Sequence, residues 1–326
     1  MAKNVLITGG MGNLGKVTSK YLTEKGFKVT LFDRVPVDRA AAFAPGALPY
    51  IKGDLLSLSD CMRAIAFSQA DVIVHLGAIP FNSELQPPYG REYGTATDGA
   101  RFVQMMNEDD TMKINTMGTY YLLDAARRMG VKDIIAATSF YAIGIGFRIS
   151  GTPFPVQYLP IDEEHPVFPE DTYSLSKYLN EETMKAFSSA YGMRCVAMRL
   201  MGVYYAGQEF SEKVHAVGVP VPDPKPEEVD VMCGTTYQYV DARDIAYFIE
   251  LSMKALDENK LAPYEDFFVI TDTHYSEDTV DVIKKRWPSL AAKGIGMDIK
   301  GSDGLISYEK STKLLGYTPQ HARRKK

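Results

Sequence analysis

The sequence predicts an α/β protein in which a doubly wound parallel sheet is joined to a smaller, discontinuous C-terminal domain. Short runs of β-branched residues alternate with amphipathic stretches through the first half of the chain, a pattern typical of βαβ units. The runs are apolar enough to be buried on both faces, as expected for strands covered by helices. With 326 residues, of which 45% are hydrophobic and 24% charged, the chain is long enough for one large core or two unequal domains.

The expected strands and helices follow one another in order. The expected strands of the first half are NVLITG, KVTLFD, LPYIKGD, DVIVHLGA and DIIAATS. The expected helices cover residues 15–25, 59–68 and 112–129. A helix at 171–191 and a strand in CVAMRLMGVY continue the alternation.

The composition changes after Tyr204. Residues 206–236 are rich in proline and glycine, which predicts a loop or part of a small second domain. Further strand and helix patterns are YQYVDARDIAYFIELSMKAL, DFFVITD and residues 276–288 and 307–316. We therefore expect two domains. Their expected bounds are 1–202, with 236–262 packing back on it, for the first, and 203–235 and 263–326 for the second, which would bind substrate.

A glycine-rich turn joins the first strand to the first helix. Gly9, Gly12 and Gly15 stand where a side chain would keep the backbone from a pyrophosphate, and the helix amides there face the anion. Asp33 ends the second strand about 20 residues on, the place of a carboxylate that holds both hydroxyls of an adenosine ribose. This pattern predicts a Rossmann-type site for NAD, because the carboxylate would repel the 2'-phosphate of NADP. Arg34 leaves NADP open, since an arginine beside that position can bind a phosphate.

Asp54 ends the third expected strand, in KGDL. It can reach the adenine from there, or it can cap the next helix. The sequence leaves both interpretations open.

A tyrosine and a lysine four positions apart lie at the start of the helix at 171–191. Tyr173 and Lys177 share one helix face, so the ammonium can lower the phenol pKa from its usual value of about 10 and hold a sugar hydroxyl of the cofactor. Ser139 ends a strand at the carboxyl edge of the sheet, where open α/β folds bind ligands. Asn115 lies in the preceding helix. The spacing of tyrosine and lysine alone is common in helices, but its combination with Ser139 predicts hydride-transfer chemistry.

Taken in order, these motifs resemble those of the extended short-chain dehydrogenases/reductases, the NAD-dependent epimerases, dehydratases and dehydrogenases of sugars. The matching pieces are TGGMGNLG, LFDR, GDL, HLGA, NTMGT, TSFYAIG, YSLSK, YVDARDIA and LLGYTP, which span residues 5–318. The resemblance implies that Tyr173 is the general acid/base, with Lys177 as its pKa modifier and ribose ligand. It implies that Ser139 donates a hydrogen bond to the reacting oxygen and that Asn115 organises a water between Lys177 and solvent. The implied cofactor contacts are Gly9, Gly12, Asn13, Leu14, Gly15, Asp33, Arg34, Asp54, Leu55, Leu76, Gly77, Ala78 and Lys177.

The chain departs from the dehydratase and epimerase patterns. The resemblance implies Asp and Glu directly after the serine position in sugar-nucleotide 4,6-dehydratases, and Phe140 and Tyr141 stand there, which disfavours water elimination. For enzymes like UDP-galactose 4-epimerase it implies an asparagine and an arginine near the substrate diphosphate. This chain has Gly202 and Thr235 at those positions. A diphosphate without its guanidinium loses a bidentate partner.

A smaller substrate is therefore expected: a free sugar, a sugar acid or another polyol derivative. A diphosphate would be accommodated only if another cation replaced the arginine. The candidates are Lys213, Lys225 and Arg243.

The connection at 81–112 is longer than is usual for the family that the chain resembles. It is expected to lie over the active-site edge, where Arg91 or Arg101 could meet a substrate carboxylate. The alternative is an exposed excursion or a dimer contact.

Three functions follow from these observations. The first is an NAD-dependent dehydrogenase of a sugar or sugar acid. The second is a nucleotide-sugar 4-epimerase, which returns its hydride and retains NAD. The third is a protein that binds the dinucleotide without catalysis, a reading that the presence of both Tyr173 and Lys177 disfavours.

Composition and histidine placement limit the partners. The net charge of −5 gives no general attraction to nucleic acid or anionic lipid. Cys61, Cys195 and Cys233 are far apart and without a histidine at ligand spacing, so neither zinc nor disulfides are expected. His75 is expected to be a buried histidine that lines the cofactor site, with one nitrogen satisfied.

The expected location is cytoplasmic and the expected state a homodimer. MAKN leads directly into a strand-like run, and no apolar stretch approaches the roughly 20 residues that span a bilayer. In the family that the chain resembles, helices equivalent to 112–129 and 172–191 pair with those of a second copy. Both carry enough apolar positions to permit this.

Overall fold

The computed structural model describes residues 3–36, 48–85, 107, 109–232 and 236–322, and the backbone of two further strands at 91–95 and 101–104. Cys233, Thr235 and the side chains of Arg91 and Arg101 lie outside this description. The roles considered for them therefore stay predictions.

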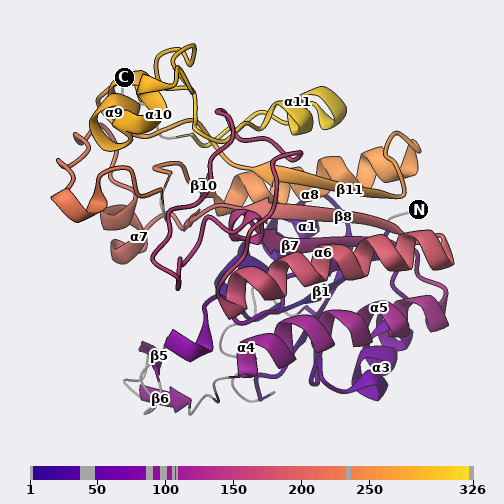
Figure 1. The fold of residues 1–326 in the computed structure, drawn as a ribbon. Coiled ribbons are helices and arrows are strands. Elements are labelled where there is room, and N and C mark those ends of the chain that lie inside the picture. Colours follow the sequence, from indigo (N-terminus) through magenta and orange to yellow (C-terminus); the bar gives the residue numbers. More distant parts are fainter. Residues whose placement is uncertain are drawn as a thin grey trace.

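Seven parallel strands form the central sheet in the order β11-β8-β7-β4-β1-β2-β3, which confirms the predicted fold class (Figure 1). The strands are β1 (Asn4–Thr8), β2 (Lys28–Asp33), β3 (Tyr50–Lys52), β4 (Val72–His75), β7 (Asp133–Ser139), β8 (Arg194–Leu200) and β11 (Tyr264–Val269). The chain builds β1, β2 and β3 in one direction and then β4, β7, β8 and β11 in the other. The strand order thus reverses between β1 and β4, the place where such sheets bind ligands.

Helices cover both faces of the sheet. Helices α3 (Leu58–Ser68), α5 (Gly118–Met129) and α6 (Thr172–Tyr191) pack together on one face, and α1 (Asn13–Glu24) and α8 (Ala242–Asp257) pack together on the other (Figure 1). Neighbouring strand residues enter opposite cores: Ile135 packs with the α1 and α8 side and Ala136 with the α3, α5 and α6 side. Both faces are buried, which explains why the strands are apolar at successive positions.

The shorter elements connect or extend this framework. They are α4 (Asp110–Met112), a π-helical turn (Lys113–Met117), α7 (Glu209–Val214), α9 (Thr279–Arg286), α10 (Pro288–Ala292), α11 (Glu309–Leu315), the 3-10 turns Ser83–Leu85, Phe140–Ile143 and Pro226–Glu228, and the two-stranded pairs β5 (Arg91–Thr95) with β6 (Arg101–Gln104) and β9 (Val203–Tyr204) with β10 (Val240–Asp241). The helix α7 lies inside the proline- and glycine-rich stretch at 206–236 and ends before its first proline, Pro220.

A third apolar core joins segments that the predicted domain bounds separate. Phe154 and Ile161, expected in the first domain, pack in this core with Trp287 and Leu305, and Ile161 forms a β-bridge with Ile306. Strand β11, expected in the second domain, pairs with β8 in the main sheet. Segments on the two sides of the predicted bounds therefore share a core and a sheet, and the division into two domains stays a prediction.

Candidate active site

The turn between β1 and α1 leaves no room for side chains. Gly9 has φ +68°, and a Cβ there would lie 2.7 Å from the backbone nitrogen of Gly77. A Cβ on Gly15 would lie 2.3 Å from the carbonyl oxygen of Gly9. Helix α1 begins at Asn13 behind Gly12, which offers no side chain to cap it. The free amides of this helix start form an anion site of the kind that binds a pyrophosphate.

A cavity of about 210 Å³ extends from this turn along the carboxyl ends of the strands. It is lined by Gly9, Gly12, Phe32, Asp33, Arg34, Gly53, Asp54, Leu55, Leu76, Gly77, Ala78, Ile79 and Ile114. Nine of the predicted cofactor contacts are in this lining, and Asn13, Leu14 and Gly15 form the adjoining helix start. Four lining residues were not among the predicted cofactor contacts: Phe32, Gly53, Ile79 and Ile114. The first three are each next in sequence to a predicted contact.

Asp33 is held in place at the cavity wall. One carboxylate oxygen accepts a hydrogen bond from the amide of Met11 at 3.0 Å, and the other accepts one from the amide of Arg34 at 2.7 Å. The carboxylate thus stands beside the glycine turn, as a ribose ligand requires. The turn, the cavity and this carboxylate together fit a dinucleotide.

Asp54 does not cap the following helix. Ser57 is the N-cap of α3, and its hydroxyl accepts from the amide of Asp60 at 3.2 Å. Asp54 instead accepts from the amide of Leu56 at 2.9 Å and faces the cavity. Of the two interpretations of Asp54, the helix cap is wrong, and the adenine contact stays a prediction.

Ser139, Tyr173 and Lys177 come together where β7 ends and α6 begins. The Ser139 hydroxyl lies near enough to the Tyr173 hydroxyl to lower the pKa of the phenol. Ser139 also accepts from the amide of Tyr141 at 3.1 Å, which fixes its position at the start of a 3-10 turn. The buried Lys177 ammonium donates to the carbonyl of Ala137 at 3.0 Å and lies 5.7 Å from the centre of the Tyr173 ring.

Burial controls the acidity of this pair. It raises the pKa of Tyr173 to about 12; the hydrogen bond from Ser139 lowers that pKa, and the charge of Asp171 raises it. Burial lowers the pKa of Lys177 to about 8, against the charge of Glu181, which raises it. The group that lowers the phenol pKa in this structure is Ser139, and the expected lowering by Lys177 stays a prediction.

Asn115 connects helix α6 to the cavity wall. Its side-chain oxygen accepts from the amide of Ile79 at 2.8 Å, and its nitrogen donates to the carbonyl of Ile79 and the hydroxyl of Ser176, both at 3.0 Å. Ile79 lines the cavity and Ser176 lies on α6. The side chain thus bridges the two parts of the site, and the predicted water beside Lys177 stays a prediction.

His75 is buried between β1 and α5. Both ring nitrogens lie at hydrogen-bond distance from threonine hydroxyls, 2.7 Å from Thr8 and 3.1 Å from Thr119, whereas one satisfied nitrogen was expected. Burial, and then the charge of Lys177, lowers the pKa of His75 to about 3. The ring is therefore neutral at physiological pH.

A buried ion network lies one helical turn beyond Lys177. The Arg199 guanidinium contacts the carboxylate of Glu181 at 2.8 Å and that of Asp266 at 2.7 Å. Sequence reasoning missed Glu181, although its position four residues after Lys177 places it on the same face of α6. This carboxylate is the charge that raises the pKa of Lys177.

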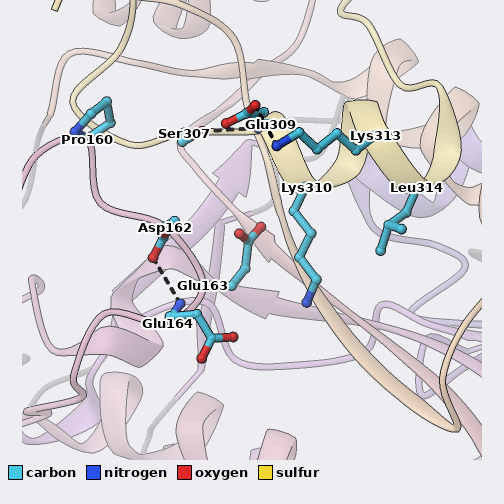
Figure 2. Close-up of a pocket in the computed structure, with 9 residues that line it drawn as sticks. All are labelled: Pro160, Asp162, Glu163, Glu164, Ser307, Glu309, Lys310, Lys313 and Leu314. Carbon is cyan, nitrogen blue, oxygen red and sulfur yellow. Dashed lines mark hydrogen bonds and ion pairs between the residues drawn. The ribbon is translucent and has the colours of Figure 1, made fainter.

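A second hollow, of about 470 Å³, lies away from these residues, between the loop at 160–164 and helix α11 (Figure 2). Glu163 in its wall accepts from the amide of Phe268 at 2.8 Å, and burial raises the pKa of this carboxyl to about 7. The two lysines that line this hollow are already paired: Lys310 contacts Glu265 at 2.8 Å and Lys313 contacts Glu309 at 2.7 Å. None of the residues predicted for catalysis or cofactor binding lines this hollow.

The described residues contain neither a membrane-spanning helix nor a cluster of metal ligands. No helix there combines the length and the apolar character needed to cross a membrane. Within the same residues, no three His, Cys, Asp or Glu side chains are grouped so that they could hold a metal ion.

Comparison with known families gives one match over most of the chain. The sequence model of the NAD dependent epimerase/dehydratase family matches residues 5–87 and 93–264 of this chain.

Individual relatives match at lower coverage. The chain is 25% identical over 200 residues to a UDP-glucose 4-epimerase of Azospirillum brasilense, covering 61% of this chain and 49% of that protein. It is 28% identical over 197 residues to a uronate dehydrogenase of Pseudomonas putida, covering 60% of this chain and 59% of that protein. The matches thus span about half of the length of these curated relatives.

A solved structure shares the fold over nearly the whole chain. The UDP-glucose 4-epimerase of Brucella ovis, crystallised with NAD, superposes with a TM-score of 0.63 at 19% identity, covering 99% of this chain and 95% of that one.

Proposed function

Because the chain belongs to the NAD dependent epimerase/dehydratase family, we propose that it is an NAD-dependent oxidoreductase acting on a secondary alcohol of a sugar or sugar acid. The observation that carries this proposal is the contact between Ser139 and Tyr173 with the Lys177 ammonium beside the same ring. A hydroxyl donor, a phenol and a cation in this arrangement can hold an alcohol oxygen and remove its proton.

The chain's own residues bind the alcohol oxygen of the substrate and accept its hydroxyl proton. Ser139 donates a hydrogen bond to the alcohol oxygen, and the Tyr173 phenolate takes the hydroxyl proton. The alcohol carbon then loses a hydride and becomes a carbonyl carbon. Bound NAD⁺ supplies the acceptor for that hydride. Gly9, Gly12 and Asp33 would hold the pyrophosphate and ribose, and Lys177 would hold the second ribose.

The surroundings of Gly202 support a substrate without a diphosphate. A Cβ on Gly202 would lie 3.1 Å from the ring of His215, so the imidazole takes the space in which a longer side chain would stand. Arg243, one candidate cation for a diphosphate, already binds Asp241 through two nitrogens at 2.9 and 2.7 Å. These contacts favour a free sugar acid over a nucleotide sugar.

Net NADH formation tests the proposal. The protein is mixed with NAD⁺ and a panel of aldoses and uronic acids, including galacturonate and glucuronate, and absorbance is followed at 340 nm. We expect NADH to accumulate with at least one uronic acid. If the folded protein bound NAD but formed no NADH with any member of the panel, net oxidation would be contradicted.

A nucleotide-sugar 4-epimerase is the second candidate, favoured by the epimerases among the relatives. It returns its hydride, so it accumulates no NADH and should copurify with NAD. A rise in melting temperature with UDP-sugars, but not with free uronic acids, would favour this candidate.

The rate of oxidation is expected to change its pH dependence near pH 8. The reactive pair is a Tyr173 phenolate beside a Lys177 ammonium. With pKa values of about 12 and about 8, the phenolate fraction rises about tenfold per pH unit below pH 8, while the ammonium stays charged. Above pH 8 the ammonium is lost as fast as the phenolate forms, so the rate should level off. Initial rates between about pH 6 and pH 10 measure this.

Lys177→Arg is the matched control for the pH profile, because a guanidinium keeps its charge over this range. The variant should lose the break at pH 8 and show a continuing rise. A break that persists in Lys177→Arg would assign it to another group.

A further inference from the structure

The first turn of helix α6 is held by a carboxylate from a distant part of the chain. Glu84 lies in the 3-10 turn Ser83–Leu85, which follows β4. One of its carboxylate oxygens accepts a hydrogen bond from the backbone amide of Thr172 at 2.7 Å, and the other accepts one from the Thr172 hydroxyl. Thr172 is the first residue of α6 and directly precedes Tyr173.

Glu84 adds to the capping of this helix. The amides of a first helical turn have no partner within the helix. Asp171 binds the amide of Ser174 at 3.0 Å, and Glu84 binds that of Thr172. Two carboxylates thus stabilise the helix start, where negative charge is favoured by the helix dipole.

The turn that carries Glu84 is itself anchored on buried residues. The amide of Ser83 donates to the Thr111 hydroxyl at 3.2 Å, and the amide of Thr111 donates to the Ser83 hydroxyl at 3.3 Å. The Thr111 hydroxyl also donates to the carbonyl of Phe81 at 2.8 Å. Ser83 and Thr111 are 4% and 0% exposed. Glu84 therefore projects from a fixed base that joins the loop after β4 to α4.

We propose that Glu84 is a positioning residue for the reaction, an inference that rests on the proposed function. Helix ends fray, and Tyr173 is the second residue of α6. By holding Thr172, Glu84 keeps this turn formed and keeps the Tyr173 hydroxyl against Ser139. Glu84 acts on the reacting atoms only through Thr172.

Two substitutions separate the contact from the charge. Glu84→Ala removes both hydrogen bonds. Glu84→Gln keeps their geometry: its amide oxygen accepts from the Thr172 amide, and its amide nitrogen donates to the Thr172 hydroxyl.

A remote carboxylate offers a matched control. Asp230 accepts from the amide of Ser289 at 2.8 Å and from the Ser289 hydroxyl at 2.6 Å, in the first turn of helix α10. Asp230→Gly removes these bonds and suits the backbone, because Asp230 has φ +61°. Like Glu84→Ala, this variant loses two hydrogen bonds at the start of a helix, but that helix carries none of the proposed catalytic residues.

The test combines hydrogen exchange with kinetics on NAD⁺ and the uronic acid of the panel that is oxidised fastest. In Glu84→Ala we expect amide exchange in a peptide covering residues 172–177 to be about tenfold faster and kcat to fall about tenfold, with the KM for NAD⁺ unchanged. Glu84→Gln should restore most of both. Asp230→Gly should accelerate exchange near Ser289 only and leave kcat unchanged.

Each other result counts against the proposal. Unchanged exchange at 172–177 in Glu84→Ala would show that Glu84 does not hold the turn. Equal losses of kcat, NAD⁺ affinity and melting temperature would show a general structural role, as would a fall in kcat in Asp230→Gly. If the unmodified protein oxidises none of the panel, the proposed function fails, and exchange at 172–177 still decides whether Glu84 holds the helix start.

Discussion

Replacing Tyr173 with phenylalanine is expected to lower kcat for the oxidation of a uronic acid by about 10³-fold. The variant keeps the ring, and with it the edge-on packing against Tyr141 at 6.2 Å between ring centres, but it has no oxygen to take the alcohol proton. Affinity for NAD⁺ should be retained, because the glycine turn and Asp33 lie on other elements. NADH formation at 340 nm measures the rate, and a binding titration measures the affinity.

Tyr191→Phe is the control for this substitution. Tyr191 ends the same helix, is 50% exposed and packs against Phe187, so loss of its hydroxyl should leave kcat unchanged. If Tyr173→Phe kept more than about a tenth of the original kcat, Tyr173 would not be the proton acceptor. Loss of NAD⁺ binding in the same variant would point to a defect of the whole site instead.

Replacing Arg199 with methionine is expected to lower the free energy of unfolding by about 3–5 kcal/mol. The Arg199 side chain is 3% exposed and lies between the carboxylates of Glu181 and Asp266. Methionine fills a similar volume but leaves the Glu181 carboxylate buried without its guanidinium partner, whereas Asp266 keeps its contact with Lys310 at 3.1 Å. Urea denaturation followed by circular dichroism measures the change.

Two variants give this prediction its controls. Lys20→Met removes one partner of an exposed pair with Glu24 and should leave the stability unchanged. Adding Glu181→Gln to Arg199→Met removes the unpaired charge and should recover most of the lost stability. If this double variant were as unstable as Arg199→Met, the loss would come from packing and not from charge.

The parts of the site that depend on local chain geometry were predictable from the sequence. The glycine turn requires positive φ and close backbone approach within a few residues, and Tyr173 and Lys177 share a face through helical spacing alone. The alternating strands likewise predicted the parallel sheet. Each of these features depends on residues that are close together in the chain.

The parts that depend on distant neighbours were not predictable. Glu84 is 88 positions from Thr172, and Arg199 meets Asp266 only because β8 and β11 pair in the sheet. The burial that raises the pKa of Tyr173 is also a property of the folded surroundings, so it could not be read from the spacing to Lys177. Pairing with a second copy through α5 and α6 stays a prediction.

One face of helix α6 carries Tyr173, Lys177 and Glu181 at successive turns, and so serves both the proposed catalysis and the buried ion network. Selection for turnover and selection for a folded protein therefore act on the same few positions. This leaves little freedom for neutral drift along that face. A lineage that acquires a new substrate is expected to change first at sites outside this face, such as Gly202 and His215. Substitution there leaves the proposed proton acceptor and the buried ion network intact.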